Sequence, residues 1–133
     1  LQYESIRNKL MKHMESPNIH RVLVASHSLG AALGTLFSLD VGLNKPNIEI
    51  DCISFGCPRV GCGRFAKLYK KIVLKTTRCV HNNDIVTKIP LPFRFKHVQG
   101  KLKLNTKTNF WIPRPVSDHD MDCYIEGIKG LSH

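Results

Sequence analysis

Residues 21–34, RVLVASHSLGAALG, constrain the fold more than any other part of the sequence. An apolar, β-branched run ends at a small residue, and a run of helix formers and small residues follows it. This pattern predicts a strand, a sharp turn and a helix, with Ser28 at the tip of the turn. It fits the nucleophile elbow G-x-S-x-G, with Ser26 in place of the first glycine and Gly30 as the second.

An elbow of this kind needs compact residues two positions before and after its serine, because the turn is strained. The first amides of the following helix lack partners within the helix and favour negative charge. The Leu29 N–H is therefore the natural first donor to an oxyanion. The same positions also fit a strand–helix unit that merely carries a serine in its turn. The residues that could work with Ser28 separate the two interpretations.

Helical and strand patterns alternate along the rest of the chain. Helices are expected over residues 2–15, 28–41, 62–71 and 118–129, and strands over residues 20–26, 48–55 and 78–82, with a strand or hairpin within residues 96–105. Such alternation predicts an α/β fold, with a mostly parallel sheet flanked by helices. The 133 residues contain no repeat or linker, so we expect one domain over residues 1–133.

A serine hydroxyl needs a base to take its proton and an acid to orient that base, in the chain order serine, acid, histidine. Asp84 fits the acid because it follows the strand at residues 78–82 and so lies at the carboxyl rim. Asp51 and Asp40 do not fit this role. Asp51 lies near the start of its strand, toward the opposite rim, and Asp40 lies on the helix after Ser28 and points elsewhere. Asp84 in an Asn-Asn-Asp run also fits a plain turn cap.

Two of the seven histidines remain as candidates for the base. His13 and His20 precede Ser28, His27 adjoins it, His81 lies within a strand and His133 on a free end. Of the other two, His119 is favoured because it precedes a helix on a loop from which its ring can reach a cleft. His97 sits on an expected strand.

The composition limits the classes of partner. The net charge of +10 suits an anionic membrane surface, and a solvated basic face explains it equally well. Nucleic acid is not expected as a partner, because no binding motif accompanies the charge. Five cysteines without a C-x-x-C pair favour mostly buried thiols in a reducing, intracellular compartment over disulfides or zinc. No signal peptide, membrane span, metal or cofactor is expected.

Five motifs together resemble the class 3 (fungal-type) lipase family of the α/β-hydrolases. They occupy residues 26–33 (SHSLGAAL), 54–61 (SFGCPRVG), 81–86 (HNNDIV), 95–98 (FKHV) and 118–124 (DHDMDCY). The resemblance implies a partial α/β-hydrolase fold and a lipase-like serine ester hydrolase that acts on lipid acyl esters. In that family Ser28 would be the nucleophile, Asp84 the orienting acid and His119 the base, and Leu29 would give one oxyanion-hole N–H.

Members of the family carry further strands, a lid and a second oxyanion donor ahead of the first helix seen here. We therefore expect this chain to be the C-terminal half of a longer enzyme, with low activity alone. A missing N-terminal segment or a partner would cover the edge of the strand before Ser28, which is apolar on both faces. Apolar residues expected to bind the acyl chain, with plain core as the alternative, are Leu91, Phe93, Phe110, Trp111 and Ile112.

Two other functions stay open at this point. A lipid- or membrane-binding module that has lost turnover would suit the net charge of +10 and the absence of the family's N-terminal strands from this chain. Binding alone, however, does not require Asp84 and His119 beside Ser28. Phospholipase A1-type specificity is the alternative within the enzyme class, because residues that select the head group would lie largely outside this chain.

Overall fold

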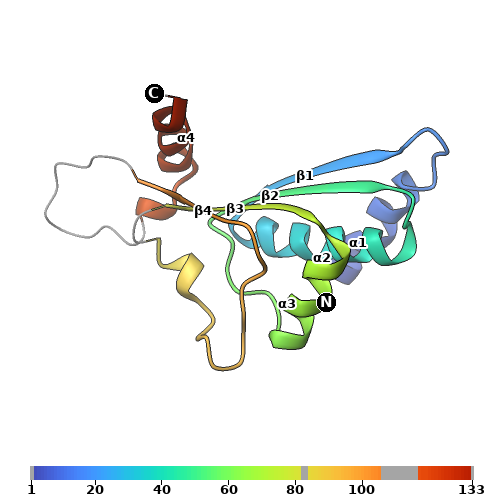
Figure 1. Cartoon of the computed structure of the whole chain (residues 1–133), viewed down its shortest axis with the longest axis horizontal. Coiled ribbons are helices and arrows are strands. Elements are labelled where there is room, and N and C mark those ends of the chain that lie inside the picture. Colours follow the sequence, from blue (N-terminus) through green and yellow to red (C-terminus); the bar gives the residue numbers. More distant parts are fainter. Residues whose placement is uncertain (1, 82–83, 106–116, 133) are drawn as a thin grey trace, which may run out of the picture.

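Four parallel strands form the sheet in a computed structural model, which describes residues 2–81, 84–105 and 117–132. The strands are β1 (Arg21–His27), β2 (Glu49–Phe55), β3 (Lys75–His81) and β4 (Lys101–Leu104). They lie side by side in chain order, β1-β2-β3-β4 (Figure 1). All three pairings are parallel. The α/β class with a parallel sheet is thereby confirmed.

Helices cover the two faces of this sheet unequally. The helices are α1 (Gln2–His13), α2 (Ser28–Asn44), α3 (Gly63–Ile72) and α4 (Met121–Lys129). Helices α2 and α3 lie against one face, and α4 covers the opposite face beside β3 and β4 (Figure 1). On the first face Phe37 and Val41 of α2 pack with Ile50 and Cys52 of β2 and with Tyr69 of α3. On the second face Tyr124 of α4 is buried between Cys79 and Leu104.

Helix α1 docks on α2 through a polar contact. Asp40 of α2 accepts hydrogen bonds from both the Nε and the Nη2 of Arg7 and from the Tyr3 hydroxyl. These bonds, led by that of Arg7, hold the pKa of Asp40 below its usual value. Asp40 is thus engaged away from Ser28, as its place on the helix predicts.

The strand that leads to Ser28 lies at an edge of the sheet. Among the described residues only β2 pairs with β1. Leu23, in the middle of β1, is 62 % exposed. Helix α4 covers the sheet beside β3 and β4 and does not extend over this part of β1. An apolar strand edge of this kind attracts other chains. The cover expected from a preceding segment or a partner stays a prediction.

One strand differs from the sequence expectation in its bounds. Strand β3 starts at Lys75, three residues before the expected start, because the polar residues Thr76 and Thr77 pair with β2 while lacking an apolar pattern. Of the strand or hairpin expected within residues 96–105, the strand is confirmed: β4 pairs parallel with β3, and Lys96 forms a separate antiparallel bridge with Gly61.

Helix α2 lies so close to β1 that Ser26 fills the space above Gly34. A Cβ at Gly34 would lie 2.5 Å from Ser26 Oγ and 3.0 Å from Val24 Cγ1. The Ser26 hydroxyl is buried and has no hydrogen-bond partner among the described residues. The serine that replaces the usual glycine therefore depends on Gly34 for room.

Gly34→Ala is expected to lower the free energy of unfolding by about 1–3 kcal/mol through overpacking, despite the better helix propensity of alanine. Adding Ser26→Gly removes the closest contact, so the double variant should be more stable than Gly34→Ala alone. Urea denaturation of the four proteins of this double-mutant cycle measures the coupling. Additive effects would mean that the two side chains do not share this space.

Candidate active site

Ser28 sits in the strained turn that the elbow pattern predicts. It directly follows His27, the last residue of β1, and is the first residue of α2. Its φ is +57°, the only positive value at a non-glycine position among the described residues. Such left-handed backbone costs on the order of 1–3 kcal/mol and is typical of functional turns.

The structure brings Ser28, His119 and Asp84 into one hydrogen-bonded row. His119 lies at the end of the short 3-10 helix η2 (Ser117–His119), and its Nε2 is 2.6 Å from Ser28 Oγ. Its Nδ1 is 2.9 Å from Asp84 Oδ2. An ionised carboxylate only accepts hydrogen bonds, so Nδ1 carries the proton and Nε2 is free to accept one from Ser28. The arrangement can remove a proton from the Ser28 hydroxyl.

Asp84 is fully buried and is held from three directions. Besides His119, the Tyr124 hydroxyl donates to Oδ2 at 2.5 Å, and the Val86 N–H donates to Oδ1 at 2.8 Å. Burial, together with the bond to Asp84, raises the pKa of Tyr124, so its hydroxyl stays a donor. These donors satisfy a carboxylate that would be costly to bury alone.

Tyr124 belongs to the motif at residues 118–124, but the motif alone does not identify this contact. The signal was the residue type itself: a buried tyrosine, unlike phenylalanine, needs a hydrogen-bond partner. The hydroxyl also accepts a bond of 3.2 Å from the His81 N–H, which fixes it between β3 and Asp84.

His27 supports His119 from the other side. Its ring stacks on the His119 ring with the centroids 4.7 Å apart, and its Nε2 donates to the His119 carbonyl at 2.8 Å. As a candidate base it had been set aside because of its position next to Ser28. The contact shows a supporting position that the sequence pattern does not indicate.

His97 lies outside this row of contacts. It is half-buried, and its Nε2 donates to the Thr87 carbonyl at 2.7 Å. Burial, with help from Arg78, lowers its pKa to about 4, so the ring is neutral at pH 7. Of the two histidines left open by the sequence, the structure brings His119 to Ser28.

Gly56 packs directly beneath the contact between Asp84 and His119. Its φ is +59°, and a Cβ there would lie 2.9 Å from Asp84 Oδ2 and 2.9 Å from His119 Nδ1. Glycine is needed at this position both for its backbone conformation and for the space.

Gly56→Ala is expected to push His119 and Asp84 apart and to lower any hydrolytic rate at least about 100-fold, because small misplacements of reacting groups are costly. Steady-state kinetics measures the loss. Gly63→Ala is the matched control, since a Cβ at Gly63 meets no described atom within 4 Å and its φ is not positive. Equal rates of hydrolysis in Gly56→Ala and Gly63→Ala would mean that hydrolysis does not require the close packing of Gly56 against His119 and Asp84.

The expected oxyanion donor, the Leu29 N–H, lies in the first turn of α2. Leu29 is the second residue of α2, so its N–H is among the four amides without an acceptor inside the helix. The steric expectation for Gly30 was wrong in one respect: a Cβ there would meet no described atom within 4 Å. The described structure thus gives no steric reason for a glycine at position 30.

The residues expected to bind an acyl chain are only partly described. Leu91 and Phe93 are exposed, Phe93 to 77 %, so the alternative that they form plain core is wrong for these two. Ile85 and Ile89, on the same segment after Asp84, are exposed as well. Phe110, Trp111 and Ile112 lie outside the described residues.

No cluster of side chains suited to a metal occurs within the described ranges. All five cysteines are free thiols. Of the helices that the structure describes, none has the length and apolarity to cross a membrane.

The comparison with protein families gives a match over most of the chain. The family model described as Lipase (class 3) matches residues 1–94, which include Ser28 and Asp84.

Individual proteins point the same way. Phospholipase A1-II 4 of Oryza sativa subsp. japonica is 32 % identical over 117 residues, covering 82 % of this chain and 29 % of the relative. A mutant form of MDLA from Penicillium cyclopium superposes with a TM-score of 0.69 and 27 % identity, over 89 % of this chain and 44 % of that one. A triacylglycerol lipase whose catalytic centre is described as a serine protease triad superposes with a TM-score of 0.65 and 28 % identity. The match covers 80 % of this chain and 43 % of that one. This chain thus spans about three tenths of the first relative and under half of these structures.

Proposed function

The chain belongs to the class 3 lipase family, and on this basis we propose that it is the part of a serine ester hydrolase that carries the Ser28–His119–Asp84 centre and acts on lipid acyl esters. The observation that carries the proposal is the position of the His119 ring, within hydrogen-bond distance of Ser28 Oγ on one side and Asp84 Oδ2 on the other. A lipid-binding module without turnover would not require this arrangement.

In the proposed reaction Ser28 Oγ attacks the ester carbonyl while its proton passes to His119 Nε2. The carbonyl oxygen becomes an oxyanion at the amino end of α2, where the Leu29 N–H is the first proposed donor. The ester C–O bond then breaks, and His119 gives its proton to the departing alcohol. Water attacks the acyl-serine, its proton passes to His119, and the fatty acid leaves as Ser28 regains its proton.

Asp84 orients the His119 ring and stabilises its charged form during both steps. Tyr124 and Val86 keep the carboxylate in place, and the His27 ring limits the movement of His119 from the other side. These three residues are positioning residues in the proposal.

The lipid class is proposed from the relatives and the exposed apolar segment. The curated relatives are phospholipases A1, whereas the structural neighbours include a triacylglycerol lipase. Phospholipase A1-type hydrolysis is therefore proposed beside the triacylglycerol type. Ile85, Ile89, Leu91 and Phe93 are exposed after Asp84 and suit contact with an acyl chain or a lipid surface.

We also propose what the protein binds besides its substrate, where it is located and what covers strand β1. The charge of +10 suits an anionic membrane surface, and the free thiols suit a reducing compartment. We also propose that residues 1–133 form one unit of a larger α/β-hydrolase domain, and that another segment or a partner covers β1. The native mass of the protein from its source tests this cover.

Vesicle experiments separate hydrolysis from mere binding. Vesicles of phosphatidylcholine with an anionic lipid, and emulsions of triacylglycerol, are incubated with the protein and with Ser28→Ala, and released fatty acid and vesicle-bound protein are measured. The proposal predicts fatty acid release that depends on Ser28. Vesicle binding without release by the wild-type protein would favour the binding module.

A further inference from the structure

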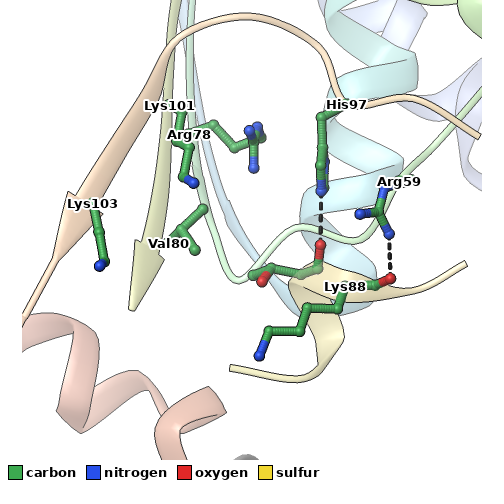
Figure 2. Close-up of a pocket in the computed structure, with 8 residues that line it drawn as sticks. Arg59, Arg78, Val80, Lys88, His97, Lys101 and Lys103 are labelled. Carbon is green, nitrogen blue, oxygen red and sulfur yellow. Dashed lines mark hydrogen bonds between the residues drawn. The ribbon is translucent and has the colours of Figure 1, made fainter. Parts of the chain in front are cut away.

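A pocket of about 200 Å³ lies between strands β3 and β4 and the 3-10 helix η1 (Val86–Lys88) (Figure 2). Among the described residues, five cationic side chains line it: Arg59, Arg78, Lys88, Lys101 and Lys103. The described lining contains no aspartate or glutamate, and neither Ser28 nor His119 belongs to it.

Arg78 is the least expected of these cations, because only 5 % of it is exposed. A solvated basic face was one explanation of the net charge of +10, and the burial of Arg78 excludes this residue from such a face. The one hydrogen bond that its guanidinium makes to a described residue joins Nε to the Val98 carbonyl at 3.4 Å. The ionisable groups that act on it are Cys57, Arg59 and Tyr124, and none of them is a carboxylate.

A buried guanidinium without a carboxylate partner is costly, because burial removes water from the charge. That loss of water is the main reason why the pKa of Arg78 is lowered, and Arg59 adds to it by repulsion. In native proteins such charges are usually paired. The guanidinium of Arg78 points into the pocket, as Figure 2 shows, so an anion there would supply the missing partner.

The other cations are placed to share one anion. Parallel pairing sets Lys101 beside Arg78 and Lys103 beside Val80, which puts both lysines on the same face of the sheet as Arg78. Arg59 is fixed opposite them, since its Nη1 donates to the carbonyls of Lys88 and Pro90. The two bonds use one of its nitrogens and leave further N–H groups for a ligand.

We propose that this pocket binds a phosphate group, either free or as the monoester head of an anionic lipid. A phosphate monoester carries about −1.5 to −2 charges and three acceptor oxygens, whereas a carboxylate carries one charge. Several converging cations with no acid among them suit the larger charge, and guanidinium forks fit phosphate oxygens in pairs. His97 in the wall is neutral at pH 7, so the positive charge of the pocket comes from its arginine and lysine side chains. This site does not depend on the hydrolase proposal.

Binding of inorganic phosphate to the full chain tests the proposal by calorimetry and by the shift in unfolding temperature, with acetate at equal ionic strength as the control anion. The test variant is Lys101→Gln with Lys103→Gln, because both side chains are exposed and we expect the fold to tolerate their replacement. The matched control is Lys70→Gln with Lys71→Gln, two exposed lysines at the end of α3 that do not line the pocket.

We expect phosphate to bind the wild-type protein and the α3 control alike, and the pocket variant at least about tenfold more weakly, since hydrogen bonds to charged groups are strong. No response to phosphate, an equal response to acetate, or equal weakening in both double variants would overturn the proposal. Vesicles of phosphatidylcholine with and without phosphatidic acid identify the source. Loss of binding to phosphatidic acid in the pocket variant alone supports the lipid, and a response to free phosphate alone supports the soluble anion.

Discussion

Ser28→Ala is expected to lower the rate of ester hydrolysis by on the order of 10⁴-fold or more, the largest effect of any substitution in this chain. The loss follows because the alanine has no oxygen to form the acyl-enzyme, and the remaining groups give only residual catalysis. Stability should change little, since serine and alanine bear similar strain at a φ of +57°. Fatty acid release under steady-state conditions measures the rate, and urea denaturation checks the fold.

Ser26→Ala is the control for this prediction. Ser26 lies two residues before Ser28 in the same turn, but its hydroxyl has no hydrogen-bond partner among the described residues. Hydrolysis should therefore survive in Ser26→Ala. If Ser28→Ala also kept its activity, another side chain would be the nucleophile and the assignment of Ser28 would be wrong.

Asp84→Asn should lower the rate of hydrolysis by about 10³- to 10⁴-fold while the protein stays folded. The carboxylate accepts from His119, Tyr124 and Val86 at once. An asparagine that keeps the Val86 bond through its oxygen turns its NH₂ group toward His119 Nδ1. The ring then carries its proton on Nε2 and cannot take the one on Ser28. Measurement of kcat and KM should show the loss in kcat.

Two comparisons make the Asp84 prediction specific. Asp122→Asn removes the same charge from an exposed position on α4 and should leave the rate unchanged. Tyr124→Phe removes one donor but leaves the His119 bond in place, so its loss should be much smaller than that of Asp84→Asn. A rate in Asp84→Asn close to that of the wild-type protein would contradict the role of Asp84 in orienting the base.

The three residues of the candidate site could be placed at one rim from the sequence because their positions follow from parallel strands. Ser28 follows β1 and Asp84 follows β3, and the carboxyl ends of parallel strands meet at the same edge. Chain order then left His97 and His119, and the local pattern favoured the histidine on a loop. The sheet itself was predictable because apolar strands and amphipathic helices alternate.

Contacts that depend on packing between distant elements could not be read from the pattern. Tyr124 reaches Asp84 only because α4 lies over β3, and Gly56 lies under His119 only through the register of β2 with β3. The burial of Arg78 was equally hidden, since β3 begins with the polar residues Lys75, Thr76 and Thr77. Sequence periodicity indicates which face of an element is apolar, but not which partner it meets.

Peptide mapping by mass spectrometry after reaction with a fluorophosphonate tests the assignment of Ser28 most directly. Such a probe is attacked by an activated serine and stays covalently attached to its oxygen. We predict one adduct per chain, on Ser28, and none in Asp84→Asn over the same time. An adduct on another residue, or an unlabelled Ser28 in folded protein that hydrolyses lipid esters, would contradict the account.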